Sequence, residues 1–397
     1  MQRGIITLND ESRYTTSYTI SKEKLDSAVK AATEKLASKL DTYAEQFVGT
    51  YSKDYVYPLG ENKTWVSGMH TGTILLAYEL TGDEQFLECA KKNIPFYKKR
   101  LEEKIVMYSH DVGFVFSPSC VALYKLTGDE AAREIALAAA EHLYDASFSK
   151  KGGFIIRSVN NSHEDWGCRT MMDTLMNIPL FFWAHKETGD EKFLHAANSQ
   201  LAITESYLIR EDGSSFHHYQ FDTKTHKPLY GCTFQGRTDE STWSRGQSWG
   251  VMGLPIAYSY NKDEDLLKLH RDVTYFTLNH LPKHNIPYWD YDFIEECDEP
   301  LDVSAGLVSA CGMLEATKYL SDSAPEKKIY KNAAAMLLDA AIDKCADYET
   351  TEFDGLVRNV TCSVPHNLCI NECALYGDFF YLEALLRHLR PDWNRYW

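Results

Sequence analysis

The sequence predicts an all-α fold, an (α/α)6 barrel built from six helical hairpins. One phrase occurs three times along the chain, as YELTGDEQFLECA, YKLTGDEAAREIA and HKETGDEKFLHAA. In each copy a glycine can end one helix, and the aspartate that follows can cap the first amides of the next. Three copies of one joint indicate a two-helix unit whose other connection varies in length. Amphipathic segments also alternate with almost wholly apolar ones, as in a barrel with an inner and an outer ring of helices.

Apolar periodicity and helix start and stop signals divide the chain into about twelve helices. They are expected at 22–48, 68–80, 84–106, 112–126, 130–147, 168–187, 191–210, 246–259, 264–282, 303–320, 325–347 and 373–389. The odd members are amphipathic, as in EKLDSAVKAATEKLASKL, whereas even members such as MMDTLMNIPLFFW are apolar nearly all round. We therefore expect the even helices inside the barrel and the odd helices around them.

The links between the helices are of two kinds. Links from an even to an odd helix are short: the three TGD turns, then 261–263 and 321–325. Links from an odd to an even helix are long, at 49–67, 107–111, 148–167, 211–245, 283–302 and 348–372. The long links should together form one rim and the mouth of a central cavity, where functional residues usually gather. Within 211–245, two alternating runs around a polar turn predict a small β-hairpin near 214–232.

Length and composition are those of a globular enzyme or binding protein. The chain has 397 residues, of which 44% are hydrophobic and 25% charged, enough for a large core. No domain boundary is visible, so we expect one catalytic domain over 1–397, with 1–21 as an N-terminal extension. The chain has no apolar stretch typical of a signal peptide or a membrane span. Ten cysteines, several inside helical patterns, suit reduced thiols and a cytoplasmic protein.

Charge and cysteine spacing limit the expected partners. A net charge of −16 and the lack of a basic stripe argue against nucleic acid. Cys362, Cys369 and Cys373 with His366 match no zinc pattern, so we expect no metal there. The 25 Tyr and 8 Trp suit either sugar stacking or a large aromatic core. We expect a monomer or a weak homodimer that binds neither nucleic acid nor membrane.

Asp173 is a candidate catalytic residue because it lies in the apolar stretch RTMMDTLMNIPLFFW, read as helical. Burial favours the protonated form of a carboxyl group and raises its pKa, as a general acid requires near neutral pH. The structural alternative is a carboxylate paired with Arg169 or with a neighbouring hydroxyl.

Asp111 is the second candidate carboxylate. It follows Ser109-His110 at the start of the fourth helix, where an aspartate is a common N-cap. That position also lies at the mouth of the cavity, on the same rim as Asp173. Two carboxylates that converge in a pocket are typical of glycosidic chemistry.

The segment GCTFQGRTDESTWSRGQSWG brings Gln235, Arg245 and Trp249 to the start of the eighth helix. Arg245 and Trp249 are four residues apart and share a helical face. A guanidinium beside an indole suits a carboxylated sugar ring, the first for the charge and the second for the apolar face. The alternative is a structural ion pair of Arg245 with Asp239 or Glu240.

Three further residues of the long links complete the candidate set. Trp65, His110 and His217 would each, taken alone, more often be a packing residue or a surface histidine than a ligand. Their significance is that all three are expected on the same rim.

These motifs together resemble a known family. The segments are SHDVGF at 109–114, RTMMDTLMNIPLFFWAHKETGDE at 169–191, SSFHHYQFD at 214–222, QGRTDESTWSRGQSWG at 235–250, YWD at 288–290 and YGDFFYLEALLR at 376–387. They resemble the unsaturated glucuronyl hydrolases of glycoside hydrolase family 88, from about Lys24 to the C-terminus. The resemblance implies a six-hairpin α/α barrel without metal or organic cofactor. It also implies removal of the Δ4,5-unsaturated uronic acid that polysaccharide lyases leave at the non-reducing end.

The resemblance also implies roles for single residues. Asp173 matches the general acid and base, and Asp111 matches a second essential carboxylate that binds sugar hydroxyls. The positions that match substrate contacts are Trp65, His110, His217, Gln235, Arg245 and Trp249. The implied mechanism is hydration, in which Asp173 protonates C4 of the enol ether and water adds at C5. The hemiketal so formed opens, and the glycosidic link is lost.

The sequence departs from the family at positions around the leaving sugar. It has Met69 and His70 where an aromatic pair is common, Val159 in place of Trp, and Cys362 in place of Tyr. Members acting on sulfated fragments share a Ser-x-x-Ser-x-Lys stretch, with which Ser363, His366 and Leu368 align. One serine thus remains, the lysine is absent, and His366 is a partial substitute. We expect Ser363 and His366 to contact the substrate.

The reaction is therefore expected to follow the family, with glycosaminoglycan disaccharides as substrates. A close alternative is unsaturated rhamnogalacturonyl hydrolysis of pectin fragments, with the same acid and another leaving sugar. A different class is a sugar isomerase or epimerase on the same fold, working through His110 and His217; such an enzyme would not need Asp173. A non-catalytic sugar-binding protein is disfavoured because both carboxylates are present.

Overall fold

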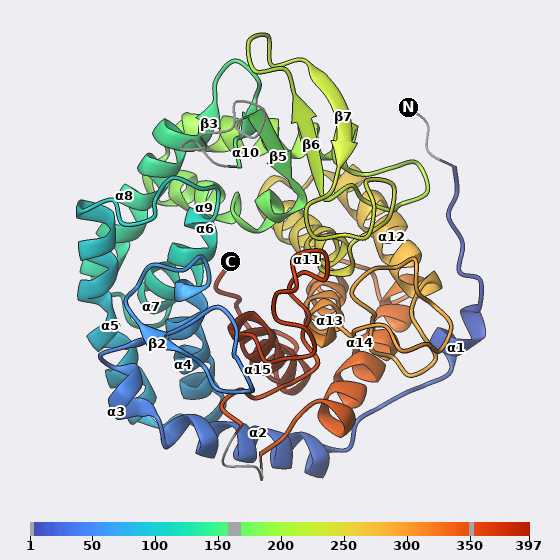
Figure 1. The fold of residues 1–397 in the computed structure, drawn as a ribbon, viewed down its shortest axis with the longest axis horizontal. Coiled ribbons are helices and arrows are strands. Elements are labelled where there is room, and N and C mark those ends of the chain that lie inside the picture. The colour runs from blue at the N-terminus through green and yellow to red at the C-terminus, as the bar shows by residue number, and fades with distance from the viewer. Residues whose placement is uncertain (1–3, 158–167, 349–352) are drawn as a thin grey trace.

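The helices form two concentric rings in the computed structural model, which describes residues 4–157, 168–348 and 353–397. In Figure 1 the chain passes round the barrel from the blue N-terminal helices to the red α15. The outer ring consists of α2 (Lys22–Ala37), α5 (Glu84–Glu102), α8 (Glu130–Ser147), α10 (Glu191–Ile203), α12 (Glu264–Asn279) and α14 (Pro325–Lys344). The inner ring consists of α4 (Ser67–Thr81), α6 (Val112–Phe116) continued by α7 (Ala122–Thr127), α9 (Pro179–Thr188), α11 (Ser244–Asn261), α13 (Val303–Thr317) and α15 (Leu375–Leu389).

Burial distinguishes the two rings as expected from the apolar patterns. In α11 every residue from Ser244 to Tyr258 is buried, and α13 is buried along nearly all of its length. In α12 and α5 one face is buried and the other is exposed. The predicted (α/α)6 barrel, with the even helices inside, is therefore confirmed.

The three TGD turns end one helix and begin the next in the same way. Gly82, Gly128 and Gly189 have φ of 73°, 73° and 72°, a left-handed conformation that costs glycine little. Asp83 Oδ1 then accepts the backbone N–H of Gln85 at 3.0 Å, and the corresponding aspartates cap the next helices of the other two copies. These turns connect an inner to an outer helix, so they lie at the end of the barrel opposite the long links.

The predicted hairpin is present and belongs to a three-stranded sheet. β6 (His218–Phe221) pairs with β7 (Pro228–Cys232), and β5 (Arg169–Met171) pairs antiparallel with the other edge of β6. This sheet packs on the helical turn that follows α10, and Figure 1 shows it at one side of the barrel.

Two predicted helix boundaries need correction. The helix expected over 168–187 starts only at Pro179, because the residues before it form β5 and a 3-10 turn, η3 (Met172–Met176). Pairing of β5 with β6 engages the backbone groups that a helix would need, and Pro179 suits the first turn of α9. The helix expected over 22–48 ends at Ala37 and is followed by α3 (Leu40–Tyr43) and β1 (Phe47–Val48).

The remaining elements are short. A π-helical turn, η1 (Ser117–Val121), separates α6 from α7, and another, η4 (Thr204–Leu208), follows α10. Two small hairpins pair β1 with β2 (Leu59–Gly60) and β3 (Phe148–Ser149) with β4 (Phe154–Ile155).

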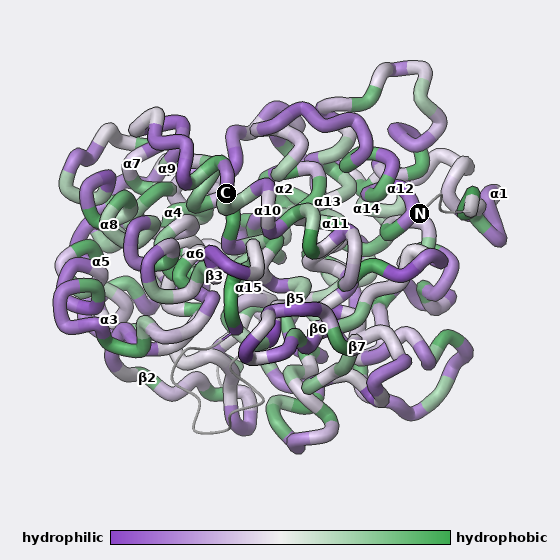
Figure 2. The backbone as a smooth tube through the Cα atoms, turned by 90° about the horizontal axis from the view of Figure 1, so that it is seen from above, coloured by the Kyte–Doolittle hydropathy of each residue, from purple (hydrophilic) through white to green (hydrophobic). Residues whose placement is uncertain are grey.

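The N-terminal segment before α2 lies against the outside of the barrel. Its helix α1 (Glu11–Thr15) packs on α14, and Asn332 Nδ2 donates to the carbonyls of Tyr14 (2.8 Å) and Thr16 (2.9 Å). Both Figure 1 and Figure 2 show α1 at the edge of the molecule near α14. Within the described ranges, no helix combines the length and the apolar character needed to cross a bilayer.

Candidate active site

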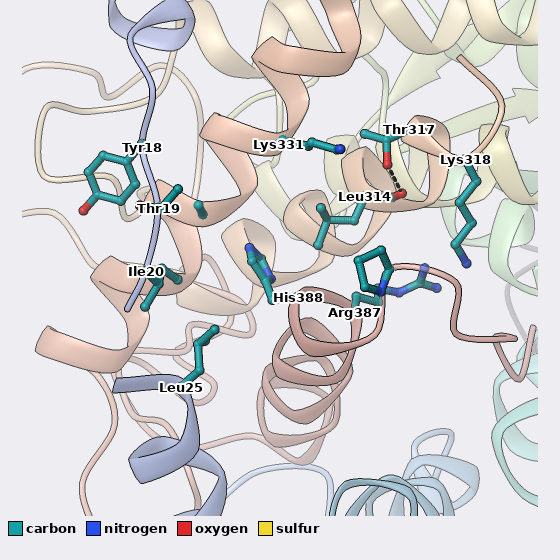
Figure 3. Close-up of a pocket in the computed structure, with 12 residues that line it drawn as sticks. Tyr18, Thr19, Ile20, Leu25, Leu314, Thr317, Lys318, Lys331, Arg387 and His388 are labelled. Atoms are coloured by element: carbon teal, nitrogen blue, oxygen red, sulfur yellow. Dashed lines mark hydrogen bonds between the residues drawn. The ribbon is translucent and has the colours of Figure 1, made fainter. Parts of the chain in front are cut away.

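Two cavities differ in their chemistry. The cavity in Figure 3, of about 270 Å³, lies between the N-terminal segment and the ends of α13 and α15. None of the described residues that line it is a carboxylate, and its Lys318 and Arg387 are ion-paired with Glu315. A cavity of about 190 Å³ at the long-link rim is lined by Trp65, His110, Asp111, Arg157, Met171, Asp173, Phe234, Gln235, Trp243, Arg245, Cys362, Ser363 and Leu368. Most of the residues singled out in the sequence thus meet in this second cavity, which is the candidate active site.

Asp173 lies on η3 at the wall of this cavity and is 7% exposed. Burial raises the pKa of its carboxyl group to about 6, against the opposing charge of His110. Its Oδ2 atom accepts no hydrogen bond from the described residues. Arg169, the structural partner considered from the sequence, donates from Nε to Gln220 Oε1 at 2.5 Å. Asp173 is therefore a buried carboxyl group whose Oδ2 is left without a hydrogen bond by the described part of the chain.

Asn177 connects the turn that carries Asp173 to the helix that follows Asp111. Its Nδ2 donates to the Asp173 carbonyl at 3.0 Å, and its Oδ1 accepts the backbone N–H of Phe114 at 3.0 Å. Gly113 permits this approach, because a Cβ there would lie 2.4 Å from the Asn177 Cα atom. Asn177 thus joins the two backbone segments that carry the candidate carboxylates.

Asp111 occupies the N-cap position of α6 but does not cap the helix with its side chain. Its Oδ2 accepts the Ser109 hydroxyl at 2.8 Å, and its Oδ1 lies 3.1 Å from His110 Nε2. The other ring nitrogen of His110, Nδ1, lies 3.1 Å from the Arg157 carbonyl. Asp111 therefore faces the cavity with a histidine beside it, rather than serving as a structural cap.

The three-stranded sheet places His217 beside Asp173. The Met172 N–H donates to the His217 carbonyl at 3.1 Å, where β5 passes into η3. His217 Nε2 lies 3.9 Å from Asp173 Oδ2. The imidazole packs on the indole of Trp243, with ring centroids 4.3 Å apart.

Arg245 lines the cavity at the start of α11, but its partner differs from both residues suggested by the sequence. Instead of Asp239 or Glu240, it forms a buried ion pair with Asp302. Its guanidinium also donates to the carbonyls of Thr361 (2.9 Å) and Cys362 (3.1 Å). The guanidinium lies 4.6 Å from the ring centroids of both Trp243 and Tyr376. Its position is therefore fixed before any ligand binds.

Gln235 and Trp65 lie on the cavity wall. Gln235 Nε2 donates to the Cys362 carbonyl at 2.8 Å, and Trp65 stacks on Tyr376 with centroids 5.4 Å apart. Trp249 lies elsewhere: it is fully buried and packs against Phe114 and Phe380. Trp249 is therefore a core residue, and its indole does not line the cavity.

Of the positions that the resemblance assigns to the leaving sugar, Ser363 and His366 lie together beside the cavity, whereas Met69 and His70 are buried in α4 and do not line it. Ser363 lines the cavity, and its hydroxyl lies 2.8 Å from His366 Nδ1. His366 is exposed and stacks on Phe234, with centroids 4.2 Å apart. Leu368 is also part of the lining, whereas Val159 lies outside the described residues.

Sequence reasoning missed several lining residues. Trp243 stands inside the motif STWSRGQSWG, two residues before Arg245, and the motif itself was the available signal. Phe234 and Met171 also stand inside such motifs, GCTFQGRTDESTWSRGQSWG and RTMMDTLMNIPLFFW, whereas Arg157 carried no comparable pattern. Arg157 lies over the Phe234 ring, 5.2 Å from its centroid, and adds positive charge near the two carboxylates.

Comparison with known proteins agrees with this geometry. The family model of Glycosyl Hydrolase Family 88 matches residues 39–285. The chain is 37% identical over 385 residues to an unsaturated chondroitin disaccharide hydrolase from Streptococcus pneumoniae, covering 95% of each chain. It is 33% identical to an unsaturated glucuronyl hydrolase from Bacillus sp. GL1, over 91% of this chain and 95% of that one. Among solved structures, an unsaturated glucuronyl hydrolase from Streptococcus agalactiae superposes with a TM-score of 0.95 at 33% identity, covering all of both chains.

Proposed function

Because the chain belongs to glycosyl hydrolase family 88, we propose that it removes the Δ4,5-unsaturated uronic acid from the non-reducing end of lyase-generated oligosaccharides. Glycosaminoglycan disaccharides are the proposed substrates, since the similar proteins include unsaturated chondroitin disaccharide hydrolases. The observation that carries the proposal is Asp173, a buried carboxyl group in the cavity with a pKa of about 6. Such a group is protonated often enough near neutral pH to act as an acid.

The proposed reaction is hydration of the enol ether. Asp173 gives its proton to C4, water adds at C5, and the Asp173 carboxylate takes a proton from that water. The hemiketal then opens and the leaving sugar departs, so the two carboxylates need not be set as acid and nucleophile. Asp111 and His110 would bind sugar hydroxyls, Trp65 and Trp243 would cover the apolar ring faces, and Arg245 would meet the uronate carboxylate. No step in this scheme requires a metal or an organic cofactor.

The direct test uses unsaturated disaccharides prepared with lyases from chondroitin, hyaluronan, heparin and pectin. The conjugated enol acid absorbs in the ultraviolet, and hydration removes that absorbance. We expect the absorbance to fall with at least one glycosaminoglycan product. A fall with pectin products alone would favour rhamnogalacturonyl hydrolysis, and constant absorbance with all of them would refute the proposal.

We further infer one catalytic domain with 1–21 as an extension, a cytoplasmic location, and a monomeric or weakly dimeric state. The location is supported by the ten cysteines, which all carry free thiols in this fold. Cell fractionation tests the location, and light scattering during size-exclusion chromatography tests the assembly.

A further inference from the structure

We propose that His217 holds the reacting water at C5 by donating a hydrogen bond from Nε2, opposite Asp173. This inference rests on the proposed hydration reaction. It assigns His217 a positioning role in the chemical step, beyond the general substrate contact expected from the resemblance.

The loop after β7 fixes the tautomer of the imidazole. The backbone N–H groups of Phe234 and Gln235 point at His217 Nδ1, at 3.3 and 3.4 Å. A nitrogen that accepts N–H donors carries a lone pair, so a neutral ring has its proton on Nε2. Burial lowers the pKa of His217 well below its usual value, and the positive charges of Arg157 and Arg245 act in the same direction. His217 is therefore a neutral ring with a permanent Nε2–H donor.

The surrounding rings fix the direction of that donor. His217 is 2% exposed, and its ring lies between Trp243, at 4.3 Å, and His218, at 4.0 Å between centroids. Its Nε2 and Asp173 Oδ2 are 3.9 Å apart. That separation is too long for a direct hydrogen bond. Both atoms are buried and neither has a hydrogen-bond partner among the described residues, so a water bound beside the line that joins them would satisfy both.

This position suits the chemistry of hydration. In the first step the electron pair of C4=C5 takes the Asp173 proton and forms the C4–H bond, which leaves a cation at C5 shared with the ring oxygen. In the second step the water oxygen bonds to C5 and its proton passes to Asp173 Oδ2, which restores the acid. His217 keeps its proton throughout. Its Nε2–H occupies one lone pair of the water, and the other lone pair is directed at the sugar.

The proposal is tested with His217→Ala, with His217→Gln, whose amide can return a donor near Nε2, and with His270→Ala as the control, a histidine of α12 that is 1% exposed and packs on Tyr330 outside the cavity lining. In His217→Ala we expect kcat to fall by about 100-fold or more, with KM changed by less than about threefold. The kcat of His217→Gln should be at least about tenfold higher than that of His217→Ala. His270→Ala should stay within about threefold of wild type. Circular dichroism verifies that each variant is folded.

Competition between nucleophiles separates water positioning from a merely structural role. In water–methanol mixtures, the ratio of C5 methyl ketal to hydrated product, followed by mass spectrometry, should rise in His217→Ala and stay unchanged in His270→Ala. An unchanged ratio and rate in His217→Ala would overturn the proposal.

The tautomer can be tested on the wild-type protein alone by ¹⁵N NMR, which does not depend on how any variant folds. We expect a protonated Nε2 and an unprotonated Nδ1 in His217 between pH 5 and 8. A protonated Nδ1 would contradict the assignment. If the wild-type enzyme hydrated no unsaturated uronide, the proposed function would fail instead, which is a distinguishable result.

Discussion

Arg245 and Asp302 form an ion pair inside the protein, in which the two side chains are 2% and 0% exposed. Asp302 precedes α13, 57 residues beyond Arg245, and it also accepts a hydrogen bond from Ser304. The pair therefore connects the starts of two inner helices directly at the cavity wall. Arg245 has a structural role as well as the proposed role of binding the substrate carboxylate.

The two roles of Arg245 can be separated by mutation. Arg245→Lys removes the planar guanidinium, so we expect KM to rise at least about tenfold while kcat changes less. Asp302→Asn leaves a buried guanidinium without its counter-charge, which should lower the free energy of unfolding by about 3–5 kcal/mol. Replacing both residues, as in Arg245→Met with Asp302→Leu, should restore much of the stability but not the substrate affinity. Urea denaturation and steady-state kinetics measure both effects, and normal affinity in the double variant would contradict the binding role.

Asp173→Asn is expected to lower kcat by at least about 1,000-fold, because the amide cannot supply the proton. Asp378→Asn is the matched control, since burial also raises the pKa of Asp378 to about 6. The Asp378 carboxylate, however, accepts the backbone N–H groups of Leu356 and Val357 and the Tyr57 hydroxyl, away from the cavity. Its substitution should reduce thermal stability and leave kcat within about threefold of wild type. A near-native rate in Asp173→Asn would mean that another group is the acid.

Activity should depend on pH through the protonated form of Asp173. Burial raises the Asp173 pKa to about 6, so the acid form predominates below that pH and is lost above it. We therefore expect kcat/KM to fall as pH rises through about 6, by about tenfold per pH unit once the carboxylate predominates. Initial rates between pH 5 and 8 measure this dependence. An activity that stayed constant up to pH 8 would exclude Asp173 as an acid with this pKa.

The sequence contained enough local information for the barrel but not for every contact of the site. Helical periodicity and the TGD turns are set by neighbouring residues, and both were predicted correctly. The strand β5 was read as helix because its partner β6 lies about 50 residues further on, and no local pattern records that pairing. The partner of Arg245, Asp302, was not predicted for the same reason, because it lies far away in the sequence. Arg157 was likewise not predicted as part of the cavity wall.

Two tryptophans of the motif STWSRGQSWG should respond differently to substitution. Trp243 lines the cavity, so Trp243→Phe should raise KM several-fold with a small effect on stability. Trp249 packs between Phe114 and Phe380 in the core, so Trp249→Ala should cost about 3–5 kcal/mol of unfolding free energy. Trp249→Phe, a milder change, should keep KM near the wild-type value. A large rise of KM in Trp249→Phe, with unchanged stability, would instead support the direct contact between Trp249 and the substrate that the resemblance implies.

Gly113 offers a test of how the two carboxylates are held relative to each other. A Cβ atom there would lie 2.4 Å from the Asn177 Cα atom and 2.6 Å from its carbonyl oxygen. Because backbone atoms cannot move aside as a flexible side chain can, Gly113→Ala must separate α6 from the turn that carries Asp173. We expect a loss of about 1–3 kcal/mol in stability and at least about tenfold in kcat. Gly82→Ala is the control, since its φ of 73° is strained for alanine but no atom would contact the new Cβ. Gly82 lies in a TGD turn away from the site, so Gly82→Ala should be less stable than wild type and keep its kcat. An equal kcat in the Gly113 and Gly82 variants would argue against a role of Gly113 in holding the two carboxylates.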